Sequence, residues 1–147
     1  MSPRVKASPL SVTRIAQPRQ GGAVDHPRPD RLLRGNPRRE TWPLYESADG
    51  VTSVGIWSCE PGMWRIAFAA SKEEYFFVLE GHVRLHDAQG VAVDVRVGEA
   101  AVIPAGFEGA FEVVQAVRKH FVLVDRAAST STSTSTSTST STLPSAP

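Results

Sequence analysis

The side chains able to do chemistry in this 147-residue chain are few and scattered. Its single cysteine, Cys59, precedes a Glu-Pro-Gly turn with no His or Asp near it, and such a lone thiol indicates a structural residue, because a nucleophilic cysteine needs a nearby base. Of the four histidines, His26 lies in a Pro-rich stretch. His82 and His86 share one strand face but lie about 13 Å apart, too far to bind one ion, and are interpreted as surface or interface residues.

Charge is distributed unevenly along the chain. Residues 1–40 hold nine basic and three acidic residues, a balance of +6, whereas the remaining 107 hold seven basic and twelve acidic, a balance of −5. We expect residues 1–30 to form a flexible basic arm; with no aromatic residue before Trp42, no nucleic-acid partner is expected. The seven Ser-Thr dipeptides near the other end have no apolar face to bury, so residues 127–147 are predicted to be disordered.

Residues 31–126 are predicted to form the folded domain. Short runs of β-branched and aromatic residues recur there every eight to twelve residues, separated by turns such as Glu60-Pro61-Gly62. The expected strands are 41–45, 51–58, 63–70, 74–79, 82–86, 91–97, 100–103, 110–116 and 117–124. No segment keeps a 3.6-residue period, so the pattern predicts an all-β sandwich or small barrel. No apolar run reaches the 18 residues of a membrane helix, and no membrane partner is expected.

The strand predicted at 74–79 is apolar on both faces apart from Glu74. Phe76 and Val78 share its parity, while Tyr75 and Phe77 point the other way. Both faces of such a strand must pack against another element or a second subunit, and a domain of this size has a thin core of its own. We therefore expect a homodimer.

Two motifs in this region resemble those of the cupin superfamily. Gly62, Glu74 and Gly81 fit the spacing of the first motif, and residues 98–106, with a Pro-x-Gly, fit the second. The flanking segments are similar to the subgroup related to the ureidoglycine aminohydrolase cupin domain: 35–39, 55–57, 61–66 and 117–120. The resemblance covers about residues 31–124 and implies a single cupin jelly-roll β-barrel.

The resemblance also implies where a metal would be held, and this chain lacks most of the ligands. The two histidines of the first motif would fall at Phe68 and Ala70, and the histidine of the second at Gly109. Only the carboxylate of Glu74 is left. Because a transition metal takes four to six donors, we expect no metal and no other cofactor.

The motif parity implied by the resemblance turns Glu74 into the barrel and places Lys119 on the last strand. These two are the candidate catalytic residues. The residues expected to bind a ligand are Trp64, Phe68, Phe76, Phe111 and, if its parity is inward, His120. Two interpretations of Glu74 stay open. It is either a group that moves a proton or holds a ligand, or a carboxylate satisfied by an internal partner such as Arg65, Arg84, Lys119 or a Trp N–H.

The leading hypothesis is a cytoplasmic, homodimeric cupin-domain protein that binds a small polar metabolite in an apolar barrel cavity without a metal. Whether such a protein catalyses a reaction stays open. One alternative is a metal-dependent enzyme of the ureidoglycine aminohydrolase type. The other is a non-catalytic structural or regulatory dimer module whose barrel is filled by its own side chains.

Overall fold

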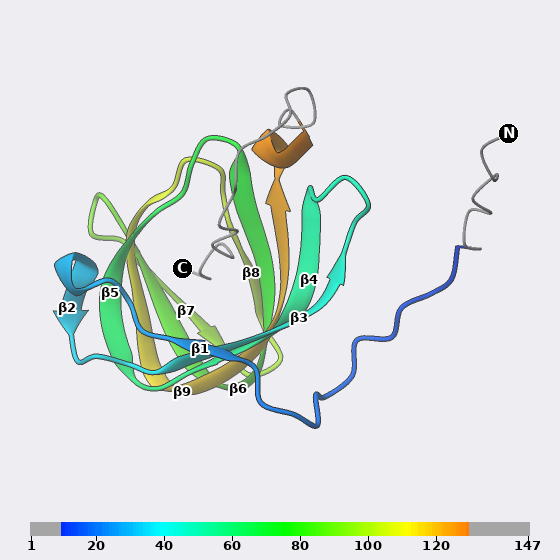
Figure 1. The fold of residues 1–147 in the computed structure, drawn as a ribbon. Helices are drawn as coiled ribbons and strands as arrows, with labels where there is room; N and C mark the ends of the chain where they lie inside the picture. Colours follow the sequence, from blue (N-terminus) through cyan, green and yellow to red (C-terminus); the bar gives the residue numbers. More distant parts are fainter. Residues whose placement is uncertain (1–9, 130–147) are drawn as a thin grey trace, which may run out of the picture.

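The computed structural model describes residues 10–129 (Figure 1). In chain order the elements are β1 (Ala23–Asp25), η1 (Pro29–Arg31), β2 (Leu32–Arg34), β3 (Arg39–Glu46), β4 (Thr52–Cys59), β5 (Gly62–Ala67), β6 (Lys72–Asp87), β7 (Ala92–Arg96), β8 (Ala100–Ile103), β9 (Glu108–Asp125) and η2 (Arg126–Ser129). Within this part of the chain the only helices are two short 3-10 turns, η1 and η2, and neither is long enough to cross a membrane. The prediction of an all-β barrel is confirmed.

All nine strands belong to one antiparallel sheet that curls around the core (Figure 1). The long strands β6 and β9 pair along most of their length and run through both sides of the barrel. On one side they continue into β4, β3, β1 and β8, which we call the β4 half. On the other side they continue into β5, β2 and β7, which we call the β5 half. The core lies between these two halves.

The long strands β6 and β9 differ from the sequence prediction, which divided each of them in two. For β6 the reason lies at Gly81, where the chain bends without reversing. Its φ is +84°, and a Cβ at this position would lie 2.1 Å from the carbonyl oxygen of Ala116 in β9. The register with β9 shifts between Val78 and Val83, so the inward parity changes from even to odd residues along β6. A glycine that looks like a turn residue in sequence is therefore a bend inside one strand.

The start of the domain also needs a correction, because β1 and the first two residues of η1 lie within the segment 1–30 that was expected to be a flexible arm. β1 pairs with β3, and Asp25 forms a bidentate ion pair with the buried Arg39, at 2.7 and 2.9 Å. The folded domain thus includes residues before 31. At the other end, η2 occupies Arg126–Ser129, and the rest of the Ser-Thr tract lies outside the described residues.

The core is dominated by large aromatic side chains. Trp57, Trp64, Phe76 and Phe111 are almost completely buried, and the ring centroids of Trp64 and Phe111 lie 5.2 Å apart. Phe111 also meets Trp57 edge-on at 5.6 Å. Burying one such side chain stabilises the fold by about 1.5–3 kcal/mol, and aromatic pairs add to this. The rings meet in the middle of the barrel, where the candidate site lies.

Candidate functional site

The centre of the barrel holds a carboxylate and an ammonium from its two longest strands. Lys119 of β9 places its Nζ 3.4 Å from Oε2 and 3.5 Å from Oε1 of Glu74 in β6. Lys119 has no exposed surface, and Glu74 is 1% exposed. The structure therefore brings together the two residues that were expected to be catalytic, at positions 45 residues apart in the sequence.

Aromatic rings surround the ammonium on its other sides. Nζ of Lys119 lies 4.4 Å from the ring centroid of Phe76, 4.5 Å from Trp57 and 4.9 Å from Phe111. These distances are in the range of cation–π attraction, which is strengthened when the cation is desolvated. The carboxylate and three ring faces together explain how a lysine is accommodated with no contact with solvent.

Burial shifts both members of this pair toward their neutral forms. Desolvation raises the pKa of Glu74, although the nearby ammonium of Lys119 opposes the shift. Desolvation also lowers the pKa of Lys119, against the attraction of Glu74. The two groups are thus closer in proton affinity than in water, which favours proton sharing between them. Because both are enclosed, this chemistry is closed to any molecule that stays outside the barrel.

The other residues expected to bind a ligand do not all join the pair. Trp64 is 2% exposed and Phe68 is 7% exposed, and both belong to the same core as Phe76 and Phe111. His120 follows the inward-pointing Lys119 directly, so it lies on the opposite face of β9, in register with residues 56 and 77. It stands on the outer surface of the β4 half and does not reach the barrel centre.

The residues at the metal-ligand positions do not fit a metal. Phe68 is a buried ring, Ala70 is exposed in the turn after β5, and a Cβ at Gly109 would lie 1.9 Å from the carbonyl oxygen of His86. A histidine at 109 would therefore have to push β6 aside. No three His, Cys, Asp or Glu side chains come together within residues 10–129.

The polar atoms left unpaired inside the barrel are also of the wrong kind for a cation. The buried indole N–H groups of Trp57 and Trp64 have no acceptor among the described residues. Together with the ammonium of Lys119 they make the interior rich in donors, whereas a metal ion needs lone pairs. The barrel interior therefore offers hydrogen-bond donors where a metal ion would need ligands with lone pairs.

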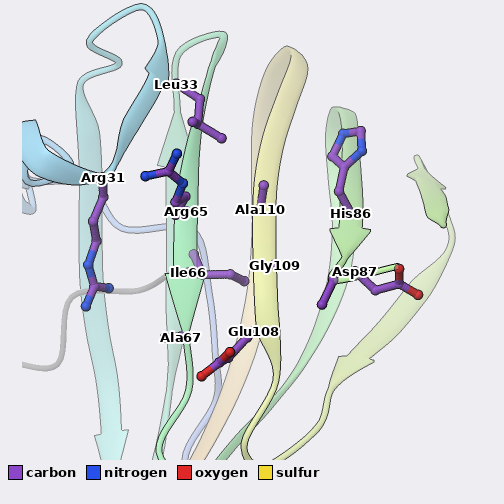
Figure 2. Close-up of a pocket in the computed structure, with 11 residues that line it drawn as sticks. Arg31, Leu33, Arg65, Ile66, Ala67, His86, Asp87, Glu108, Gly109 and Ala110 are labelled. Carbon is purple, nitrogen blue, oxygen red and sulfur yellow. The ribbon is translucent and has the colours of Figure 1, made fainter. Parts of the chain in front are cut away.

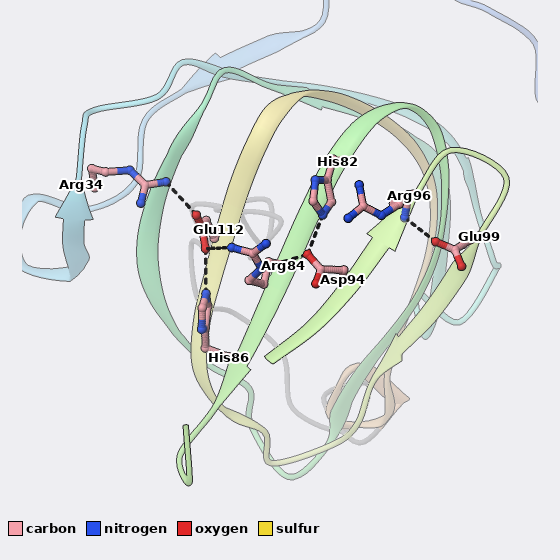
Figure 3. Close-up of polar contacts among 8 residues, drawn as sticks. All are labelled: Arg34, His82, Arg84, His86, Asp94, Arg96, Glu99 and Glu112. Carbon is pink, nitrogen blue, oxygen red and sulfur yellow. Dashed lines mark hydrogen bonds and ion pairs between the residues drawn. The ribbon is translucent and has the colours of Figure 1, made fainter. Parts of the chain in front are cut away.

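A second polar cluster lies on the outer face of the β5 half (Figure 3). The carboxylate of Glu112 binds Nε2 of His86 at 2.8 Å and Nη2 of Arg34 at 3.1 Å. Nearby, Asp94 accepts hydrogen bonds from His82 at 2.6 Å and from Arg84 at 2.9 Å. Both histidines were expected only as surface or interface residues, and their partners were missed. The period-2 spacing of 82, 84 and 86 was the signal in the sequence, but their partners depend on strand register.

The pKa values of the two carboxylates in this outer cluster are lowered by their partners. Partial burial raises the pKa of Glu112, but the hydrogen bonds from His86 and Arg34 outweigh it and hold this pKa below its ordinary value. For Asp94 the hydrogen bond from His82 is the main cause of the lowered pKa. The two carboxylates of the outer cluster are therefore ionised and hydrogen-bonded to their partners.

Three hollows in the described part of the chain lie away from the buried pair. One of about 500 Å³ lies where η1, β5, β9 and β6 meet (Figure 2). A second, of about 520 Å³, lies beside Trp42, and a narrow one of about 140 Å³ opens between β7 and β8. Neither Glu74 nor Lys119 lines any of the three. The cavity that was expected beside Glu74 is not one of these hollows.

Comparisons with known proteins agree with this fold. Residues 46–121, slightly more than half of the chain, match the family model described as the EutQ-like cupin domain. A search of curated proteins gave no match. Among solved structures, a DUF861-family protein from Pseudomonas syringae pv. tomato is 20% identical with a TM-score of 0.62, over 70% of this chain and 45% of that one. The present chain thus spans less than half the length of the Pseudomonas protein.

Two further structures share the fold at lower similarity. A putative ethanolamine utilization protein Q from Salmonella typhimurium LT2 is 19% identical with a TM-score of 0.52, over 63% of this chain and 72% of that one. An ectoine synthase from P. lautus is 14% identical, also with a TM-score of 0.52, over 59% of this chain and 64% of that one. At such identities the similarity concerns the fold and not the activity.

Proposed function

This chain belongs to the family of EutQ-like cupin domains, and we propose that it is a metal-independent member that acts by binding a small polar molecule. The observation that carries the metal-independent part of this proposal is the buried ammonium of Lys119, 3.4 Å from the motif carboxylate of Glu74. In a metal-binding cupin this glutamate would face a metal ion. Here the ammonium of Lys119, which is part of the chain itself, compensates the charge of this glutamate.

Electrostatics favour this proposal over a metal-dependent enzyme of the ureidoglycine aminohydrolase type. A divalent ion bound to Glu74 would lie close to the ammonium of Lys119, in an interior of low dielectric where like charges repel strongly. Only one of the four ligand positions carries a donor side chain, and the position at Gly109 has no room for another. The metal-dependent alternative therefore has no support from the residues of the site.

The packing of the barrel centre favours binding at the surface of the domain. The rings expected to line a ligand cavity contact one another, with the centroids of Trp64 and Phe111 5.2 Å apart and those of Phe76 and Phe111 6.2 Å apart. A ligand inside the barrel would have to displace these rings or break the buried ion pair. This supports a barrel filled by its own side chains, as in the alternative of a non-catalytic structural or regulatory dimer module. We place ligand recognition outside the barrel.

A homodimer is part of the proposal, and the outer face of the β4 half supports it. Tyr75 and Val102 are in register on this face and are 45% and 59% exposed. Val122 continues the same row, while Phe77 and His120 form the next row. An apolar sheet face of this kind usually has a cover. The cytoplasmic location expected from the sequence stays a prediction.

The N-terminal residues supply the argument that this cover is a second copy. Residues 10–18 run away from their own barrel as an extended strand-like segment (Figure 1), in which Leu10 and Val12 are fully exposed. This segment leaves the domain beside Trp42, whose indole N–H donates to the carbonyl of Gln20 at 2.8 Å. Trp42 lies on the same outer face, in the row of His120. A copy docked on this face would meet the segment.

Elemental analysis tests the metal-independent proposal. The tag-free protein is incubated with excess Mn, Fe, Ni or Zn, desalted and measured by mass spectrometry, together with Glu74→Gln and the control Glu73→Gln. Glu73 is the neighbouring carboxylate and pairs with Arg126 near the surface. We expect substoichiometric metal in all three proteins. One metal per chain that is lost in Glu74→Gln and kept in Glu73→Gln would refute the proposal.

Light scattering tests the dimer. We expect twice the 15.9 kDa mass of the chain for the native protein, and the single mass for the double variant Tyr75→Lys/Val102→Lys. Leu33→Lys is the control, because Leu33 of β2 is 44% exposed, much like Tyr75, and lies on the β5 half. A native monomer, or a double variant that stays dimeric, would contradict the interface.

A further inference from the structure

The hollow on the outer face of the β5 half has the size and shape of a ligand site. It measures about 500 Å³, which is within the range of small-molecule sites. Its floor is Ala110 of β9, which lies in register between Arg65 of β5 and His86 of β6. A methyl group between two long side chains leaves the floor lower than its walls. Figure 2 shows Arg65 and His86 on opposite sides of the β9 segment.

One wall of the hollow carries two guanidinium groups that are not used elsewhere in the fold. Arg65 is exposed, and neither its side chain nor that of Arg31 has a hydrogen-bond or ion-pair partner among residues 10–129. Most other arginines of the domain are paired, for example Arg34 with Glu112. Free guanidinium groups beside a hollow suit a carboxylate, which they bind through two parallel hydrogen bonds.

One end of the hollow carries a carboxylate of the opposite charge. Glu108 is exposed, lines the hollow and has no hydrogen-bond or ion-pair partner in the described part of the chain. It lies two residues before Ala110 in β9, a distance of about 7 Å along the strand. Asp87 also lines the hollow, but its carboxylate accepts the backbone N–H groups of residues 89 and 91 in a turn. Glu108 is therefore the acid available to a ligand.

The opposite wall is held in place by the outer polar cluster. His86 is fixed by its 2.8 Å hydrogen bond to Glu112, and Glu112 is in turn held by Arg34 at 3.1 Å (Figure 3). Glu112 is only 8% exposed, so its carboxylate is largely enclosed between these two partners. A wall built this way keeps its shape when a ligand enters, which reduces the ordering cost of binding.

We propose that this hollow binds a small zwitterion, whose carboxylate contacts Arg65 and Arg31 and whose ammonium contacts Glu108. The cationic groups of the site lie on one wall and the carboxylate at one end, so they can face the opposite charges at the two ends of such a molecule. This inference deepens the binding function proposed above and rests on it, since it names the place and the ligand class. It does not depend on whether the barrel centre holds a metal.

Three probes of equal chain length test the charge pattern. The full-length, tag-free protein is titrated with 4-aminobutanoate, succinate and 1,4-diaminobutane, and binding is followed by NMR shifts of the residues around the hollow. We expect saturation with the zwitterion, and weaker binding of the dianion and the dication, because each of these places one like charge against the site. Failure of 4-aminobutanoate to saturate, or a preference for either other probe, would overturn the assignment.

Variants of exposed residues identify the site without disturbing the fold. Arg65→Met and Glu108→Gln should each weaken binding of 4-aminobutanoate by about tenfold or more, as expected for the loss of one charge-assisted hydrogen bond. Arg96→Met is the control, since Arg96 is an exposed arginine that does not line the hollow. Unchanged affinity in Arg65→Met would overturn this site and leave the binding function standing. The metal analysis described above decides the metal-independent proposal separately.

Discussion

Lys119→Met tests the central ion pair most directly. Methionine keeps much of the length and apolar stem of lysine but removes the ammonium, so Glu74 is left 1% exposed without the cation 3.4 Å away. Removing one partner of a buried ion pair costs about 3–5 kcal/mol, because the other charge stays uncompensated. We expect the unfolding free energy of the variant to fall by this amount at neutral pH.

The pH dependence gives this prediction its sign. Burial already raises the pKa of Glu74 above 4.5 with Lys119 present, and loss of the ammonium raises it further. A carboxyl whose pKa is raised on folding contributes stability that is fully present below pH 4.5, its ordinary pKa. This contribution is lost as the pH rises through the pKa of the folded state. The loss of stability in Lys119→Met should therefore grow from acid to neutral pH, by at most about 1.4 kcal/mol per pH unit.

The partner variant should behave in the opposite sense. Glu74→Gln leaves the ammonium of Lys119 unpaired, and burial lowers its pKa below 10.5. An ammonium whose pKa is lowered on folding leaves the stability intact above pH 10.5, its ordinary pKa. Stability is then lost as the pH falls through the pKa of the folded state. The double variant Glu74→Gln/Lys119→Met contains neither charge. It should be more stable than either single variant at neutral pH and nearly independent of pH in this respect.

Urea unfolding of the four proteins at several pH values between about 5 and 9 measures these differences. A coupling energy computed from the cycle isolates the pair from effects of packing. If Lys119→Met were as stable as the native protein at neutral pH, or if its stability rose with pH, then Lys119 would not be the cation that compensates Glu74. The assignment of the barrel centre would then be wrong.

Two further predictions concern backbone geometry and thiol reactivity. Gly81→Ala should destabilise the fold by more than about 2 kcal/mol in urea unfolding, because it adds the cost of a positive φ to a clash with the Ala116 carbonyl. The control Gly90→Ala has a similar φ but open space around the new Cβ, and it should lose only about 1–2 kcal/mol. Equal losses in the two variants would contradict the clash. Burial raises the pKa of Cys59 to about 12, and its thiol donates to the carbonyl oxygen of Glu60, so iodoacetamide should modify it only after denaturation; rapid labelling of the native protein would show that it is accessible.

Local period and turn chemistry were sufficient to predict an all-β barrel, and the resemblance to the cupin motifs implied the inward position of Glu74. Neither was sufficient to choose the partner of that glutamate. Arg65 follows the inward Trp64 and so points outward, while Arg84 points outward only because the bend at Gly81 changes the parity of β6. The choice of Lys119 depends on the pairing of β6 with β9, which no local pattern reveals.

The same bend explains why the outer cluster was missed. His86 and Glu112 are 26 residues apart, and they meet only because the shifted register aligns the second half of β6 with the first half of β9. Unshifted pairing would place different side chains opposite each other, since a slip of one residue exchanges the two faces. The bend at Gly81 therefore keeps Arg84 and His86, in the second half of β6, on the outer face.

The division of charges between core and surface bears directly on where a ligand can be recognised. Nζ of Lys119 lies 3.4 Å from the carboxylate of Glu74, so the barrel centre presents no free charge to an incoming molecule. Recognition of a polar ligand requires groups that are exposed and unpaired before binding, because breaking a buried pair costs more than a new contact returns. In the described part of the chain, Arg65 and Glu108 meet this condition at the edge of one hollow. If the metal of a cupin is replaced by a lysine, ligand binding is therefore expected to move from the barrel centre to the outer face of the sheet.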